Sequence, residues 1–423
     1  MPFRIVIVGT GIAGLSAAIV LSNKGHNITI VEATSQLQAI GGFVVADSNA
    51  SRCLDYLGVY GEFIEKCGTD NQAIYFRRFA DGKPVLNVTH MEFVDQFQYP
   101  SRWGVHRADY QQILYAAAIE RNVEVRLGCR VVEVDKNSPA VIIKDGERIE
   151  ADLVIGADGK WGQGVNSVVR TAILSDSDIS FRDSGFDVTR INYPENLVLS
   201  DSETSPLMEA CNVFLGPGSC IPVQPVRRGD NKILCADFLT PRDSNSAPAG
   251  ARRKDVARIR EFFKPYTSAV QKMMSYVDEA FVWQLYDLTC KTWWNGNVVL
   301  IGDAAHAVLP FAGSGGAMAL EDSLSLAECL DRVSNVDAIP QALQMFQAIR
   351  KPRCDLVRDY GVTNSKLWTM PDGPQQQERD KMFKTIMGFG PQPSEKLPLG
   401  DIPESPTAPS FKFWLRGYDI LDF

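Results

Sequence analysis

Near its amino terminus the chain reads RIVIVGTGIAGLSAAIVLSN, residues 4–23. A five-residue stretch rich in β-branched residues comes first, a glycine-rich turn follows, and an apolar run of helical length completes it. The glycines are Gly9, Gly11 and Gly14. This spacing lets the chain turn sharply, lets a diphosphate approach the backbone, and lets the helix pack close to the sheet. The stretch therefore predicts a strand, turn and helix whose amino-terminal end binds the phosphates of a dinucleotide.

The residues after this helix support the same site. Residues 27–31 read as a second strand, and Glu32 follows it directly. A carboxylate in that place can accept hydrogen bonds from both hydroxyls of an adenosine ribose, and its charge disfavours a 2′-phosphate. The sequence therefore predicts a Rossmann-type domain that binds FAD or NAD rather than NADP.

The stretch from Ile5 to Asn23 contains no charged residue, which is also typical of a membrane span. The glycine spacing favours a buried parallel strand followed by a buried helix instead. We therefore expect neither a membrane span nor a targeting peptide.

Composition narrows the remaining classes of function. The 423 residues are 45% hydrophobic and 22% charged, as in ordinary globular proteins. Lys plus Arg number 43 against 51 Asp plus Glu, and the formal net charge of −8 argues against binding to nucleic acid or to an anionic membrane. The nine cysteines form no CxxC pair, which favours a reducing, cytoplasmic location. The four histidines lack the spacing of a metal site.

Helix and strand patterns alternate through the first 172 residues, and the helical rhythm then gives way to short strand-like runs at 197–199 and 233–238. We therefore expect an α/β fold with three parts: a dinucleotide-binding domain formed by 1–172 and 280–350, an inserted sheet-based substrate lobe over 173–279, and a C-terminal helix with a proline-rich wrapping tail over 351–423. The sequence predicts helices over 48–57, 255–263 and 268–276 and a further helix with Asp109 as its N-cap. It also predicts a hairpin over 141–149.

At two further places a buried strand is followed by a tight turn that contains an aspartate, and we call these turns the GADG corner and the Asp303 corner. The first, LVIGADG, places Asp158 after residues 153–155, and the second, VVLIGDAAH, places Asp303 after residues 298–301. The second corner leads into PFAGSGGA, residues 310–317, and a helix that begins near Gly316. His306 reads as a structural part of this corner rather than as an acid–base group.

Together with Arg107, these motifs resemble those of the single-component (group A) flavoprotein monooxygenases, which have the para-hydroxybenzoate hydroxylase fold. The order GxGxxG, Arg107, GADG, GDAAH is the order in that family. The ending FWLRGYD, residues 413–419, is similar to the salicylate-hydroxylase-like branch of fungal secondary metabolism. The resemblance covers essentially the whole chain.

The resemblance implies that the first domain binds FAD. It implies that Glu32 binds the adenosine ribose, that Arg107 binds the polar chain of the flavin, and that Asp303 binds its ribityl or pyrophosphate region. It also places Asp158 among the cofactor-binding residues. The turn before Gly316 would lie against the isoalloxazine, where the positive end of the following helix stabilises the negative charge of a reduced flavin.

The resemblance also implies a reaction. NAD(P)H would dock transiently and reduce the FAD, and O2 would then form a C4a-hydroperoxyflavin that transfers one oxygen atom to an electron-rich aromatic substrate. Arg190, in FDVTR, aligns with a family segment that reaches over the flavin, and its guanidinium could hold a phenolate or a departing oxygen. Asp47 stands where the family usually has proline, and it could orient Arg190 or act as an acid.

Other interpretations of these residues stay open. Arg190 could be a surface arginine of a strand, and Asp47 could be a helix N-cap. If both face the flavin, the pair suits acid-assisted opening of an epoxide, which favours indole alkaloid epoxidation over phenol hydroxylation. Residues 160–166, directly after the GADG corner, form an insertion relative to the family.

Other classes of protein share parts of this pattern. An FAD-dependent oxidase or dehydrogenase would share the cofactor site without inserting oxygen, and a nicotinamide-dependent dehydrogenase would use the GxGxxG turn for NAD. A flavin-dependent halogenase should show a WxWxIP signature, which the tryptophan-containing stretches 283–285 and 293–294 do not match. The sequence specifies neither the substrate, nor NADH against NADPH, nor an oligomeric state.

Overall fold

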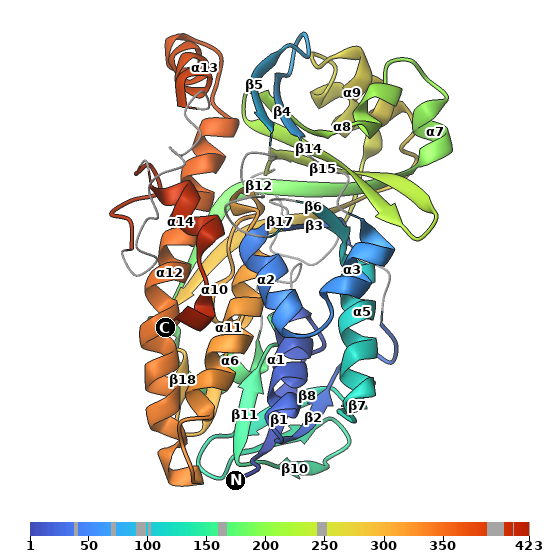
Figure 1. Cartoon of the computed structure of the whole chain (residues 1–423). Helices are drawn as coiled ribbons and strands as arrows, with labels where there is room; N and C mark the ends of the chain where they lie inside the picture. The colour runs from blue at the N-terminus through green and yellow to red at the C-terminus, as the bar shows by residue number, and fades with distance from the viewer. Residues whose placement is uncertain are drawn as a thin grey trace.

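The computed structural model describes residues 1–37, 41–68, 73–89, 99, 103–159, 167–242, 252–386, 402–408 and 410–422. Two sheet-based lobes lie one above the other in Figure 1, and the long helix α12 (Ile339–Trp368) runs beside the lower one. The architecture is α/β, as the sequence predicts.

The lower lobe is built on a six-stranded sheet in the order β18-β19-β11-β1-β2-β7. All neighbouring pairs are parallel except β18 with β19, which is antiparallel. The strands are β1 (Arg4–Val8), β2 (Asn27–Val31), β7 (Glu124–Arg126), β11 (Leu153–Gly156), β18 (Trp294–Asn295) and β19 (Val298–Leu300). Strand β1 lies between β2 and β11 and is almost wholly buried, because helices and a second sheet cover the two faces of this layer.

Helices α1 (Ile12–Asn23), α5 (Arg107–Glu120) and α11 (Gly315–Leu330) pack together on the parallel sheet. Helix α1 is buried on nearly every side, which explains why its sequence shows no polar stripe. The other helices of this lobe are α2 (Ser48–Tyr56), α3 (Tyr60–Cys67), α6 (Val168–Ile173) and α10 (Asp303–His306). A three-stranded sheet of β8 (Val131–Asp135), β9 (Ala140–Ile143) and β10 (Arg148–Glu150) completes it.

The upper lobe is built on an eight-stranded sheet in the order β16-β17-β12-β15-β14-β13-β4-β5. Every pair is antiparallel except β13 with β4. The strands are β4 (Ala73–Arg78), β5 (Pro84–Thr89), β12 (Ile179–Pro194), β13 (Cys211–Gly216), β14 (Ser219–Arg228), β15 (Asn231–Pro241), β16 (Arg252–Lys254) and β17 (Ala280–Cys290). Helices α7 (Glu195–Leu199), α8 (Val256–Phe262) and α9 (Ser268–Ser275) belong to the same lobe.

The predicted boundaries of the substrate lobe, 173–279, do not coincide with the edges of this sheet. Strands β4 and β5 come from the segment that the sequence assigns to the first domain, and β17 begins where the second part of that domain was expected. The parallel pairing of β4 with β13 joins residues far apart in the chain, and no local pattern reveals such pairing.

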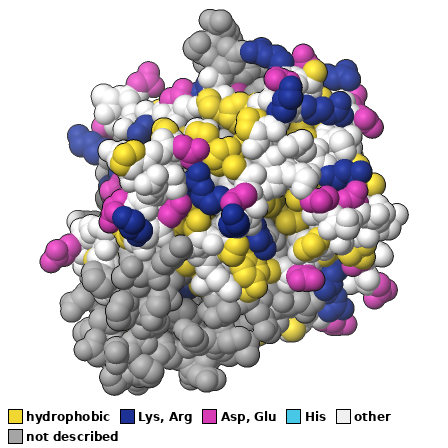
Figure 2. Space-filling model, turned by 90° about the horizontal axis from the view of Figure 1, so that it is seen from above, with side chains coloured by type: hydrophobic (Ala, Val, Ile, Leu, Met, Phe, Trp, Pro, Cys, Tyr) yellow, Lys and Arg dark blue, Asp and Glu magenta, His cyan; other side chains and the backbone are white. Residues whose placement is uncertain are grey.

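A small two-stranded sheet of β3 (Phe43–Ala46) and β6 (Trp103–His106) lies at the junction of the two lobes, where β6 contacts β14 and β3 contacts α11. Short 3-10 turns occur at η1 (Asp176–Asp178), η2 (Ser205–Met208), η3 (Pro310–Ala312), η4 (Val336–Ala338) and η5 (Ile420–Asp422). Seen from above, the upper lobe carries hydrophobic side chains grouped between acidic and basic ones (Figure 2).

Several local predictions are confirmed and two are wrong. The helices predicted over 48–57, 255–263 and 268–276 and the 141–149 hairpin are present. Residues 197–199 belong to helix α7 rather than to a strand, because their apolar run is too short to separate the two periods. Helix α5 starts earlier than predicted: His106, not Asp109, is its N-cap and accepts a hydrogen bond from the Ala108 amide.

The proline-rich segment after residue 370 is not wholly an extended tail. Helix α13 (Pro374–Ile386) starts on a proline, which is tolerated at the first position because its missing N–H has no partner there. Helix α13 packs against β5, and α14 (Phe411–Gly417) packs against α2. Among the described residues, none of the helices combines the length and apolar character needed to cross a bilayer.

Candidate functional site

The three glycines of the first turn serve different purposes. Gly9 has a φ of +107°, and a Cβ atom on it would lie 2.6 Å from the Ala157 carbonyl oxygen. A Cβ on Gly14 would lie 2.1 Å from the Gly9 carbonyl oxygen, so this glycine is needed for packing within the turn. A Cβ on Gly11 would meet no protein atom within 4 Å. Gly11 borders a cavity, and the open space beside its backbone fits a bound diphosphate.

This difference gives a testable prediction. Gly11→Ala should leave the thermal stability of the FAD-free protein nearly unchanged but raise the Kd for FAD about 10- to 150-fold, because displacing a phosphate loses at least one charge-assisted hydrogen bond. Gly14→Ala should instead destabilise the protein itself by about 1–3 kcal/mol. Fluorescence titration with FAD and thermal melts of both variants separate the two effects. Wild-type FAD affinity in Gly11→Ala would contradict the assignment.

Glu32 stands at the end of β2, as the sequence predicts, and its carboxylate is held from two sides. One oxygen accepts hydrogen bonds from the amide and hydroxyl of Thr10 at 3.0 and 2.9 Å, and the other accepts from the amide and hydroxyl of Thr34 at 2.9 Å each. Burial opposes ionisation, but these hydrogen bonds outweigh it and lower the pKa of Glu32. An ionised Glu32 therefore braces the glycine turn. Its contact with a ribose stays a prediction.

Arg107 and Asp303 both line the cavity. Arg107 is the first residue of α5, and Asp303 is the first residue of α10, directly after Gly302 with its φ of +58°. Burial lowers the pKa of Arg107, the positive charge of Arg190 lowers it further, and the carboxylate of Asp303 opposes both. The guanidinium still remains protonated at neutral pH. The two side chains present opposite charges to a ligand between the lobes.

The turn at 313–316 supplies a helix terminus to the cavity. Gly313 takes the left-handed conformation with a φ of +62°, and α11 begins at Gly315. A Cβ on Gly316 would lie 2.9 Å from Cγ1 of Val44, so β3 packs closely on this turn. The first amides of α11 have no partner within the helix, and together with the helix dipole they favour a partial negative charge beside them.

Asp158 has a structural role at the start of α6, and its predicted contact with the cofactor stays a prediction. Its carboxylate accepts hydrogen bonds from the Ser167 hydroxyl and from the amides of Val168 and Val169, so it caps helix α6. Burial raises its pKa and these hydrogen bonds oppose the shift. Arg170, on the same helix, donates to the Ala304 carbonyl oxygen at 3.0 Å and ties α6 to the Asp303 corner. The 160–166 insertion lies outside the described residues.

The two predicted catalytic residues are each paired with a residue that the sequence analysis did not identify. Arg190 on β12 faces Asp237 on β15 in direct register, and its Nε lies 3.2 Å from Asp237 Oδ2. Asp47 is the N-cap of α2 by position, without a capping hydrogen bond from its side chain, and its Oδ1 lies 3.7 Å from Nε of Arg416 on α14. The structure pairs Arg190 with Asp237 and Asp47 with Arg416, and the catalytic roles predicted for Arg190 and Asp47 stay predictions.

Asp237 is a candidate site residue that sequence reasoning missed. It is 7% exposed, it lines the cavity, and its Oδ1 has no hydrogen-bond partner among the described atoms. Burial raises the pKa of Asp237, and the neighbouring Arg190 opposes that shift. A polar residue within the apolar run 233–238 was the available signal, but only the register of β15 against β12 shows that it faces Arg190.

One cavity of about 720 Å³ joins these groups. It runs between the glycine turns of the lower lobe and the sheet of the upper lobe. The predicted site residues that line it are Gly11, Arg107, Arg190, Asp303 and Gly316. The predicted site residues that are not part of its described lining are Gly9, Gly14, Glu32, Asp158 and Asp47.

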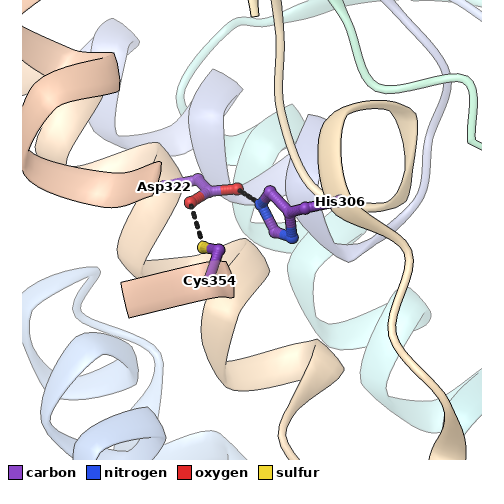
Figure 3. Close-up of side chains that lie close together, drawn as sticks. All are labelled: His306, Asp322 and Cys354. Carbon is purple, nitrogen blue, oxygen red and sulfur yellow. Dashed lines mark hydrogen bonds and ion pairs between the residues drawn. The ribbon is translucent and has the colours of Figure 1, made fainter. Parts of the chain in front are cut away.

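His306 lies outside this cavity and belongs to a buried charge cluster. Its Nε2 is 2.6 Å from Asp322 Oδ2, and the Cys354 thiol lies on the other side of the same carboxylate (Figure 3). Burial disfavours the imidazolium, but the charge of Asp322 outweighs it and raises the pKa of His306 well above its usual value. Asp322 also accepts hydrogen bonds from the Gly302 amide and from Arg350 Nε, both at 2.9 Å. These contacts fix the Gly302 corner and support the structural interpretation of His306.

Comparison with known proteins agrees with this geometry. The profile of the family described as "FAD binding domain" matches residues 3–360. An FAD-dependent monooxygenase of Beauveria bassiana, OpS4, is 28% identical over 432 residues, which cover 99% of this chain and 96% of that protein. The 3-amino-4-hydroxybenzoate 2-monooxygenase of Streptomyces cremeus is 30% identical over 382 residues, which cover 90% of this chain and 91% of that protein.

A solved structure has the same fold. Salicylate hydroxylase in a substrate complex superposes with a TM-score of 0.78 over 100% of this chain and 97% of that chain, at 20% identity.

Proposed function

The chain belongs to the FAD binding domain family and is an FAD-dependent monooxygenase, and from this membership we propose that it uses NAD(P)H and O2 to insert one oxygen atom into an electron-rich aromatic secondary metabolite. The observation that carries the proposal is the shared cavity. Its walls bring the dinucleotide turn at Gly11, the helix terminus at Gly316 and the Arg190–Asp237 pair to one space.

The residues present fit FAD. The open backbone at Gly11 leaves room for a diphosphate, Arg107 and Asp303 offer a cation and an acceptor to the polar chain, and the start of α11 offers amides to a flavin ring. Bound there, FAD would supply the redox and oxygen chemistry, which side chains cannot supply themselves.

The contribution of the protein is to bind, orient and exclude water. The Arg190 guanidinium can hold a phenolate or a departing oxygen, while Asp237 fixes it through Nε. Because burial raises the pKa of Asp237, this carboxyl can also exchange a proton with the substrate through Oδ1. Apolar walls at Pro222 and Leu239 keep this part of the cavity dry.

Asp47 would act as a positioning residue. Its carboxylate pairs with Arg416, and Arg416 lines the cavity. Any effect of Asp47 on turnover would therefore depend on the position of Arg416 and α14.

The names of the relatives, which include an aminohydroxybenzoate monooxygenase, support an aromatic substrate. The pairing of a cation with a buried carboxyl supports indole epoxidation as well as phenol hydroxylation.

An FAD-dependent oxidase is the alternative. Turnover with NAD(P)H and a panel of aromatic metabolites separates the two, provided that hydrogen peroxide and organic product are both quantified. A monooxygenase should convert most of the consumed NAD(P)H into oxygenated product. An oxidase would release one hydrogen peroxide for each reduced flavin reoxidised and leave the aromatic compound without added oxygen.

A further inference from the structure

The cavity extends well beyond the Arg190–Asp237 pair, along the inner face of the upper sheet. Alternate residues of three strands point into it, as the two-residue period of a strand requires. They are Ile74 and Phe76 on β4, Leu86 and Val88 on β5, and Cys211 and Val213 on β13. The next residue along β13, Phe214, faces the opposite way and belongs to the separate core under α8 and α9. We call the part of the cavity bordered by these six residues the apolar arm.

The strand order gives the length of this arm. Asp237 lies on β15, and the sheet continues through β14, β13 and β4 to β5. Four strand spacings of about 4.8 Å place β5 about 19 Å from Asp237. A single benzene ring with small substituents spans roughly 6 Å on ordinary bond lengths. A simple benzoate held at Arg190 would therefore leave most of the arm without a ligand.

The opposite wall of the arm is aromatic and continuous with the flavin-side turn. Phe311 in η3 contacts Trp368 at the end of α12, with ring centroids 5.8 Å apart. Phe76 contacts Trp368 at 5.4 Å and Phe383 of α13 at 6.0 Å. Opposite the sheet, the rings of Phe311, Trp368 and Phe383 thus extend this wall from the 310–316 turn toward β5, and Phe76 of the arm contacts the last two.

The charged side chains of the cavity lie elsewhere. Among the described lining residues they are Arg107, Arg190, Asp237, Asp303, Lys412 and Arg416, which come from α5, β12, β15, α10 and α14. The strands that form the arm contribute only apolar side chains and one thiol to the described lining. The six residues that define the apolar arm thus carry no charge, whereas the charged lining residues come from other elements and α12 adds the uncharged polar residues Thr363 and Asn364.

We propose that the apolar arm binds a large apolar substituent of the substrate, such as an alkyl or prenyl chain or a fused hydrocarbon ring system, while the reacting aromatic ring lies at Arg190 and Asp237. This assignment rests on the proposed function for the position of the reacting ring. It distinguishes the chain from enzymes whose substrates are single-ring benzoates.

Binding of 4-alkylphenols to the FAD-loaded enzyme tests the arm without requiring turnover. The alkyl chain runs from methyl to heptyl, and quenching of flavin fluorescence reports the Kd. We expect binding to tighten about fourfold for each added methylene, because each is transferred from water to an apolar wall. An affinity that does not change with chain length would overturn the proposal.

Variants that fill the arm separate specific binding from general hydrophobic adsorption. Val213→Phe on β13 and Val88→Phe on β5 each place a ring in the arm, and the use of two strands keeps the test valid if one variant misfolds. Both should abolish the gain from chain length while leaving the Kd of 4-methylphenol unchanged. The matched control is Val132→Phe, at a position on β8 that is 51% exposed and outside the cavity. It should retain the wild-type dependence, and the loss of that dependence in the control would contradict the proposal.

Product and hydrogen peroxide analysis of turnover with NAD(P)H, run beside these titrations, distinguishes this proposal from the proposed function. Oxygenated product together with a chain-length-independent Kd would refute the apolar arm and leave the monooxygenase assignment intact. A Kd that falls with chain length in an enzyme that only releases hydrogen peroxide would support the arm and refute oxygen insertion.

Discussion

Arg190→Lys should lower kcat/KM by about 10²- to 10⁴-fold, the range expected for loss of a group that stabilises charge or moves a proton in the transition state. A lysine keeps the positive charge but lacks the planar fork that donates through Nε to Asp237 and presents further N–H groups to a ligand. The FAD content should remain that of the wild type. Steady-state kinetics on the responsive aromatic compound, with flavin content from absorbance, measure both quantities.

The matched control is Arg182→Lys on the same strand. Arg182 pairs with Asp287 and is not among the described residues that line the cavity, so its substitution should leave kcat/KM nearly unchanged.

Asp237→Asn should cause a loss as deep as that of Arg190→Lys if Asp237 exchanges a proton, and a milder loss if it only orients the guanidinium. The double variant should be no worse than the worse single variant, because the pair acts as a unit. Wild-type turnover of Arg190→Lys would remove the pair from the mechanism.

Arg350→Met should destabilise the protein by about 3–5 kcal/mol, the cost of leaving buried charges without their partner. The Arg350 guanidinium is fully buried and lies 2.7 Å from Glu321 and 2.9 Å from Asp322. Asp322 in turn holds the Gly302 amide and His306. Equilibrium unfolding in urea measures the free energy of unfolding, and the FAD-free protein should be compared so that the cofactor does not mask the loss.

The exposed ion pair of Arg253 with Glu279 provides the control for this variant. Their side chains are 70% and 58% exposed, and such pairs contribute about 0–1 kcal/mol. Arg253→Met should therefore change the free energy of unfolding only slightly. An Arg350→Met protein as stable as Arg253→Met would show that the buried cluster does not hold the Gly302 corner together.

Much of the lower lobe could be predicted from the sequence because its signals are local. Gly9 has the turn conformation and Gly14 the close packing that their spacing indicates, and Glu32 follows β2 as expected, whereas the diphosphate contact at Gly11 stays a prediction. The corner at Asp303 and the helix that begins at Gly315 also follow from contiguous residues. In each case a turn, a strand end or a helix start decides the position of the side chain.

The remaining features depend on contacts between distant segments. Asp237 faces Arg190 only because β15 pairs with β12 in one register, and a shift of one residue would turn its side chain to the other face. Asp47 meets Arg416 because α14 packs on α2 from the far end of the chain. Asp158 caps α6 across the insertion after the GADG corner, which the resemblance alone did not indicate.

The most direct test of the account is turnover with NAD(P)H under ¹⁸O2, with mass spectrometry of the aromatic product. The account predicts that each product molecule carries one labelled oxygen atom, and that the label is absent when only the water is labelled. A product that takes its oxygen from water, or an unchanged aromatic compound with hydrogen peroxide equal to the NAD(P)H consumed, would contradict it.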